Sequence, residues 1–171
     1  MKDKPFPQCP FEPLRHSFLS RDVEFFIRLA YNQALKAWEA GEIPVGAVIE
    51  YGGEIVAQAH NMVETLQDPT AHAEMLCLRH GAETLGDWRL QDCTLYVTLE
   101  PCPMCAGAMV MSRVGKCVYG APDPEKGCCG SVYDLPADPA LGSTGTWEQA
   151  GDPEVYRELL QACFRKRRTE K

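Results

Sequence analysis

The chain has 171 residues, of which 45% are hydrophobic and 24% charged, and its formal net charge is −7. These values are ordinary for one globular domain that buries most of its surface, and they exclude a disordered or fibrous protein. A net negative charge also opposes long-range attraction to a polyanion such as nucleic acid.

The ends of the chain and its cysteines bear on location. No apolar run is long enough to span a bilayer, and the N-terminus has no apolar signal segment, so we expect a cytoplasmic protein without a membrane anchor. Nine cysteines, an odd number, fit reduced thiols better than a disulfide framework. Residues 1–19 are rich in proline and are expected to form a loosely ordered N-terminal arm before a single domain over residues 20–171.

Helical and strand patterns alternate along this domain. Apolar residues from Val23 to Trp38 recur at helical spacing, and Gly41 ends that helix. The pattern then predicts a hairpin of strands 45–51 and 55–59, a helix 71–85, a strand 94–99, a helix 103–112, a strand 116–120, loops over 121–152 and a helix 153–168. This order predicts an α/β protein with helices packed on a central mixed sheet.

Two short motifs supply groups that bind metals, namely His72-Ala73-Glu74 and Pro101-Cys102-Pro103-Met104-Cys105. One imidazole and two thiolates are typical zinc ligands, and three ligands leave the fourth tetrahedral position to water, as in catalytic sites. Glu74 is then available as a base. The two motifs match the known H-x-E…P-C-x-x-C signature of zinc-dependent nucleobase deaminases, so the pattern is recognised and not deduced.

Both motifs are expected at helix N-termini. Thr70 is the predicted N-cap of a helix that starts near Ala71, while Cys102 and Pro103 suit the N-cap and first position of the later helix. Unpaired backbone N–H groups at such ends favour thiolate over thiol. Zinc would supply an activated water there, and Glu74 would carry its protons to a ring nitrogen and a departing amine.

Other functions fit each motif alone. A lone C-x-x-C also suits half of a structural zinc site or a redox pair. The other seven cysteines form no second C-x-x-C, however, and a redox pair needs no preceding His-x-Glu. Together the motifs favour catalytic zinc.

Three stretches resemble the bacterial tRNA adenosine deaminase family, which has a three-layer α/β/α cytidine deaminase-like fold with a central mixed five-stranded sheet. They are residues 43–48 (IPVGAV), 68–74 (DPTAHAE) and 95–120, which includes TLEPCPMCAGA. The similarity spans about Arg21 to Asp134 and resumes in the last helix. It implies a hydrolase with one Zn²⁺ per subunit, held by the following residues: His72, Cys102 and Cys105. Glu74 would be the proton shuttle.

The resemblance also implies a substrate and its contacts. The family's enzymes are homodimers that convert the wobble adenosine of a tRNA anticodon stem-loop to inosine. By this match Asn61 hydrogen-bonds the nucleoside, Ile43 lines the base pocket, the Ala73 backbone orients the base, and Asp123 lies near the nucleic-acid strand. An amide suits a purine edge. Asn61 alone would suit a turn, but the match favours the functional role, whereas Asp123 equally suits a turn and Ile43 equally suits a helix-to-strand connection.

The chain departs from the family in charge. It has no Lys or Arg between Lys126 and Arg157, and residues 141–145 (LGSTG) stand where the family has Asn-His and basic residues. Met62 and Val63 likewise replace basic residues. A basic segment at 164–168 (FRKRR) nevertheless resembles the family's C-terminal cluster, where local charge would contact phosphates.

Three functions therefore remain open. The first is a tRNA adenosine deaminase that flips a loop base into its pocket. The second is a deaminase of a free base or nucleoside, of guanine or cytosine type, which the acidic balance favours. The third is a non-enzymatic zinc module that binds RNA or protein, which would have no use for the carboxylate of Glu74.

Overall fold

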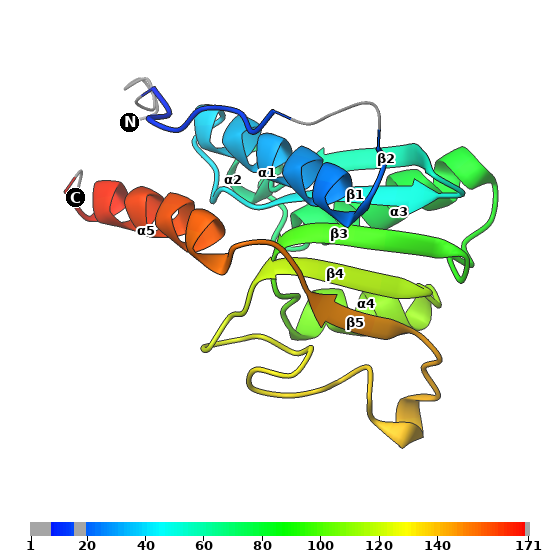
Figure 1. Ribbon diagram of the computed structural model, residues 1–171. Helices are drawn as coiled ribbons and strands as arrows, with labels where there is room; N and C mark the ends of the chain where they lie inside the picture. Colours follow the sequence, from blue (N-terminus) through cyan, green and yellow to red (C-terminus); the bar gives the residue numbers. More distant parts are fainter. Residues whose placement is uncertain (1–7, 16–19, 170–171) are drawn as a thin grey trace.

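The structure is a computed structural model that describes residues 8–15 and 20–169. Figure 1 shows its helices on both sides of one sheet. The elements in chain order are α1 (Val23–Glu39), β1 (Gly46–Tyr51), β2 (Glu54–His60), α2 (Val63–Leu66), α3 (Ala73–Leu85), β3 (Cys93–Leu99), α4 (Pro103–Met111), β4 (Lys116–Ala121), the 3₁₀ helix η1 (Pro139–Leu141), β5 (Thr146–Gln149) and α5 (Pro153–Thr169).

The five strands form one mixed sheet in the order β2-β1-β3-β4-β5. β1 runs antiparallel to both β2 and β3, whereas β3, β4 and β5 run parallel to one another. The predicted α/β fold with a mixed five-stranded sheet is therefore confirmed. Because β3 and β4 are parallel, their carboxyl ends lie at the same edge, where α/β proteins commonly bind ligands.

Two apolar layers hold the helices to the sheet. Val48 of β1 packs on the side of α1 and α5, and its neighbours Ala47 and Ile49 pack on the side of α3 and α4. This alternation is the period of two expected for a strand buried on both faces. Gly46 lets α1 lie close to β1, because a Cβ there would overlap the Ala30 carbonyl oxygen.

The sequence prediction fails for two short elements. Residues 121–152 were predicted as loops, yet Thr146–Gln149 forms the edge strand β5 beside β4. The one-turn helix α2 was also not predicted. Both have only four residues, which is too short for a clear hydrophobic period.

Part of the expected N-terminal arm lies against α1. The ring of Phe11 meets Trp38 edge-on with centroids 6.3 Å apart. The backbone of Leu14 exchanges two hydrogen bonds with the side chain of Asn32. Residues 1–7 and 16–19 of the arm lie outside the described residues. Among the helices that are described, none combines the length and apolar character needed to cross a membrane.

Candidate metal centre and substrate pocket

The two predicted metal motifs meet because each occupies the N-terminus of a helix. Cys102 is the N-cap of α4 and Pro103 its first residue, as predicted. The N-cap of α3 is His72, so the predicted N-cap at Thr70 is wrong. The Thr70 hydroxyl and backbone N–H both donate to Asp68 Oδ1, at 2.7 and 2.8 Å, which uses them in a turn before the helix.

The side chains of His72, Cys102 and Cys105 form a compact triangle of donor atoms. His72 Nδ1 lies 3.7 Å from Cys102 Sγ and 3.6 Å from Cys105 Sγ, and the two sulfurs are 3.7 Å apart. Tetrahedral zinc, with bonds of about 2.3 Å to sulfur and about 2.05 Å to nitrogen, requires about 3.8 Å between sulfurs and about 3.6 Å between nitrogen and sulfur. The triangle therefore fits zinc and leaves the fourth position open.

The electrostatics of the triangle favour one thiolate even before a metal binds. Hydrogen bonding with the Cys105 thiol, followed by that with His72, lowers the pKa of Cys102 to about 4. The same contact with Cys102, together with burial, raises the pKa of Cys105. Contact with Cys102 also raises the pKa of His72. Bound zinc would take both sulfurs as thiolates and His72 as the neutral imidazole.

Glu74 follows in the first turn of α3 and is only 4% exposed. Burial raises the pKa of its carboxyl group, because an apolar environment disfavours the charged form. A carboxyl group with a raised pKa accepts a proton more readily than an exposed one and can then return it. Glu74 is therefore suited to move protons at the open face of the triangle.

These groups face a pocket of about 490 Å³ at the carboxyl ends of β3 and β4. It contains six of the eight residues selected from the sequence, namely Ile43, Asn61, His72, Glu74, Cys102 and Asp123. The other two are buried beside them. Ala73 lies between His72 and Glu74, and Cys105 completes the triangle.

Asn61 is held at the pocket by a buried carboxylate. Its Nδ2 donates to Glu42 Oε2 at 3.1 Å, and Glu42 is 0% exposed. The nitrogen of the Asn61 amide is thus turned toward Glu42, with one of its two N–H groups committed there.

A second buried carboxylate, Glu100, orders the loop that follows β4. It accepts N–H bonds from Asp123 at 3.0 Å and Cys129 at 2.9 Å, and both the N–H and the hydroxyl of Ser131 donate to it. Asp123 Oδ1 accepts from the N–H groups of Glu125 and Lys126 at 2.9 and 3.2 Å. The Asp123 carboxylate therefore caps a turn in the pocket wall.

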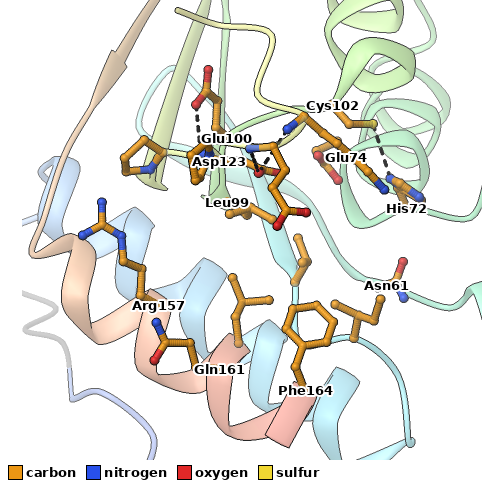
Figure 2. Close-up of a pocket in the computed structure, with 17 residues that line it drawn as sticks. Asn61, His72, Glu74, Leu99, Glu100, Cys102, Asp123, Arg157, Gln161 and Phe164 are labelled. Carbon is orange, nitrogen blue, oxygen red and sulfur yellow. Dashed lines mark hydrogen bonds between the residues drawn. The ribbon is translucent and has the colours of Figure 1, made fainter. Parts of the chain in front are cut away.

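The opposite wall belongs to α5, of which only the basic segment 164–168 was predicted to contact the substrate. Figure 2 shows Arg157, Gln161 and Phe164 across the pocket from His72 and Cys102. Phe164 is 44% exposed. Farther along α5, Arg167 points back into the protein, with Nη2 donating to the Gly41 carbonyl at 2.6 Å.

Several of these residues could not be identified from the sequence. A single glutamate such as Glu42 or Glu100 has no characteristic spacing, and its burial depends on amides far along the chain. The α5 residues belong to an ordinary amphipathic helix, and only the fold places them opposite the metal donors. The FRKRR cluster was the one signal that could have directed attention to α5.

Comparison with known proteins places this geometry in a class. Residues 20–121 match the family model for the cytidine and deoxycytidylate deaminase zinc-binding region, which accounts for the donor triangle and for zinc as its metal. The chain therefore belongs to this class of zinc-dependent deaminases.

Within the class, the chain belongs to the tRNA-specific adenosine deaminase family. It is 47% identical over 148 residues to the tRNA-specific adenosine deaminase of Bacillus subtilis, covering 86% of this chain and 92% of that one. A solved structure from work on tRNA:A34 deaminases has 37% identity and a TM-score of 0.76, over 79% of this chain and 98% of its own. The structure of the guanine deaminase from Bacillus subtilis has 35% identity but a TM-score of 0.58, over 85% of this chain and 94% of its own.

Proposed function

We propose that this protein deaminates adenosine to inosine at the wobble position of a tRNA anticodon. The observation that carries the proposal is the zinc triangle and the buried Glu74 carboxyl opening on one pocket, in a chain 47% identical to a tRNA-specific adenosine deaminase over most of both lengths. A non-enzymatic zinc module gives no reason for Glu74 to be buried at that position.

The residues of the pocket divide the reaction between them. Zinc held by His72, Cys102 and Cys105 would supply an activated water when bound. Glu74 takes one proton from the attacking water and delivers it to N1 of the adenine ring, and it then takes the second proton from the new C6 hydroxyl group and delivers it to the departing amine. A bond from C6 to oxygen forms, the bond from C6 to the exocyclic nitrogen breaks, and the products are inosine and ammonia.

The other pocket residues would hold the nucleoside. Asn61 presents its amide to a polar edge of the nucleobase, and the apolar side chain of Ile43 packs on the base. The backbone of Ala73, between His72 and Glu74 in the chain, orients the base. Asp123 would lie near the strand of the RNA through the turn that it caps. These roles follow the family match, and three of the four residues, Asn61, Ile43 and Asp123, line one pocket.

The distribution of charge supports an RNA substrate despite the net charge of −7. The acidic residues of 134–152 do not line the pocket. Glu148 instead pairs with Lys116 at 2.8 Å, and Asp138 accepts from the N–H of Ala140 at 2.9 Å. Lys126 and Arg157 line the pocket together with the acidic Asp123 and Glu125, and α5 continues beyond the pocket into its basic end.

A free-base deaminase is the second candidate, because the guanine deaminase structure has similar identity. The higher TM-score of the tRNA:A34 deaminase structure favours the RNA enzyme. We also propose that the protein acts as a cytoplasmic homodimer on the anticodon stem-loop, as the family match implies.

The test is inosine formation on a short anticodon stem-loop with adenosine at the wobble position, beside free adenosine, guanine and cytidine. We expect inosine in the stem-loop, with a rate that falls between about 50 and 200 mM salt because phosphate contacts release counterions. A guanosine-wobble stem-loop is the matched control. Ammonia from a free base, with an inert stem-loop, would contradict the proposal.

A further inference from the structure

Glu42 is a carboxylate buried away from the metal centre, and the reaction described above does not use it. It lies between Gly41, which follows α1, and the start of β1, and its side chain is 0% exposed. Burying a carboxylate is costly unless each oxygen is hydrogen-bonded. Three N–H groups satisfy it, namely Asn61 Nδ2 at 3.1 Å, the Glu64 backbone at 3.1 Å and the Thr65 backbone at 2.6 Å.

Two of these bonds cap the short helix α2. Glu64 and Thr65 lie in its first turn, and the N-cap residue Met62 makes no side-chain cap bond of its own. A Ser or Asp at position 62 would provide such a cap locally. Capping α2 therefore does not require a buried carboxylate from a distant segment, and the third bond, to Asn61, has no part in it.

An asparagine amide can rotate by half a turn and exchange its donor and acceptor sides. A carboxylate beside it removes this ambiguity, because the carboxylate only accepts. Glu42 thus keeps Nδ2 of Asn61 on the side that faces Glu42. The positions of the acceptor Oδ1 and of the second N–H group are thereby fixed. Figure 2 shows Asn61 at the pocket edge, between Phe164 and His72.

We propose that Glu42 is a positioning residue that fixes the Asn61 amide and thereby sets which nucleoside edge the pocket accepts. The inference rests on the proposed function for its substrate. Glu42 is itself held in place, because Arg167 of α5 donates to the adjacent Gly41 carbonyl at 2.6 Å. A rigid carboxylate is what an orienting role requires.

A double-mutant cycle with Glu42→Gln and Asn61→Ala tests the coupling on the wobble stem-loop. Gln keeps the volume of Glu but offers a donor in place of one acceptor. We expect Glu42→Gln to lower kcat/KM by about tenfold in the native protein but by less than about twofold in the Asn61→Ala background. An equal loss in both backgrounds, or no loss in the native protein, would overturn the proposal.

Met62→Ser is the matched control for the capping role. It supplies a local cap to α2, so in the Glu42→Gln protein it should restore thermal stability without restoring kcat/KM. Recovery of kcat/KM by Met62→Ser would show that Glu42 acts through α2 alone and would overturn the proposal.

A second measurement does not depend on turnover. The side-chain NH₂ resonances of Asn61, assigned by their loss in Asn61→Ala, should exchange slowly with water in the native protein and fast in Glu42→Gln. Equal exchange in both proteins would overturn the positioning role. If the native protein makes no inosine in the stem-loop, the proposed function fails, but the positioning role can still be tested. The double-mutant cycle is then repeated on the free base that releases ammonia, where Glu42 and Asn61 should still be coupled.

Discussion

The metal end of the pocket and its α5 side are built in different ways. At the metal end, His72, Glu74 and Cys102 come from the first turns and caps of two helices and are fixed by local backbone geometry. On the α5 side, Arg157 and Phe164 belong to a separate helix and are partly exposed. The difference indicates that the metal donors are placed by short rigid motifs, whereas the α5 wall is brought to the pocket only by the complete fold, and we propose that this wall contacts the RNA.

The largest effect is expected from Cys102→Ala. Loss of one of three zinc ligands should remove the metal and all activity, because the remaining two donors cannot hold zinc tightly. Zinc per protein, measured by metal analysis on the purified variant, checks this. Cys128→Ala, at another buried cysteine outside the triangle, should keep its zinc. Full zinc occupancy with normal turnover in Cys102→Ala would contradict the assignment of Cys102 as a zinc ligand.

Glu74→Ala should separate metal binding from proton transfer. The variant keeps its zinc ligands, so zinc content should be normal, but turnover should fall by at least about 10³-fold, as for a lost general acid and base. Single-turnover rates on the stem-loop measure the loss. Near-normal rates would remove Glu74 from the chemistry.

Glu100→Gln tests the part of the pocket wall formed by the loop after β4, which Glu100 orders by hydrogen bonds. The substitution replaces one carboxylate oxygen by an NH₂ group, which would face the N–H groups that donate to that oxygen in the native protein. Loss of a hydrogen bond to a charged group lowers the free energy of unfolding by about 2 kcal/mol. For a chain of this size that predicts a fall in Tm of about 4–8 °C, with kcat/KM reduced by about tenfold. Calorimetry and turnover measure both, and Glu125→Gln on the exposed rim should leave Tm unchanged. An unaltered Tm for Glu100→Gln would mean that the wall does not depend on this carboxylate.

The smallest effect on chemistry is expected at the basic end of α5. The triple variant Arg165→Gln, Lys166→Gln and Arg168→Gln should weaken stem-loop binding by several fold and reduce the slope of log affinity against log salt by about 2. Zinc content and Tm should not change. Arg167→Gln should instead lower Tm, since Arg167 bonds the Gly41 carbonyl. An unchanged salt slope in the triple variant would place the RNA elsewhere.

The same contrast explains what the sequence could predict. The metal donors and the strand–helix order were predictable because ligand spacing, caps and hydrophobic periods are local signals. The Thr70 N-cap was wrong because Asp68 accepts both of its donors, a choice between two local bonds that spacing does not decide. β5 escaped prediction because only its Trp147 is even half-buried at the sheet edge.

The buried carboxylates show why the rest of the site could not be predicted. Glu42 is satisfied by N–H groups 19, 22 and 23 residues away, and Glu100 by backbone N–H groups 23, 29 and 31 residues away. No sequence pattern near Glu42 or Glu100 predicts these hydrogen-bond partners. The α5 wall is still farther from the metal motifs in sequence, so its place in the pocket follows only from the sheet order.

The most direct test of the central claim is the affinity of zinc-loaded Glu74→Ala for the anticodon stem-loop. If the metal end performs the chemistry and the α5 side holds the RNA, this inert protein should still bind the stem-loop tightly, with an affinity that falls steeply with salt. Adding the triple α5 substitution to it should weaken that binding. Failure of the Glu74→Ala protein to bind the stem-loop, or binding indifferent to salt, would contradict the division of the pocket into these two regions.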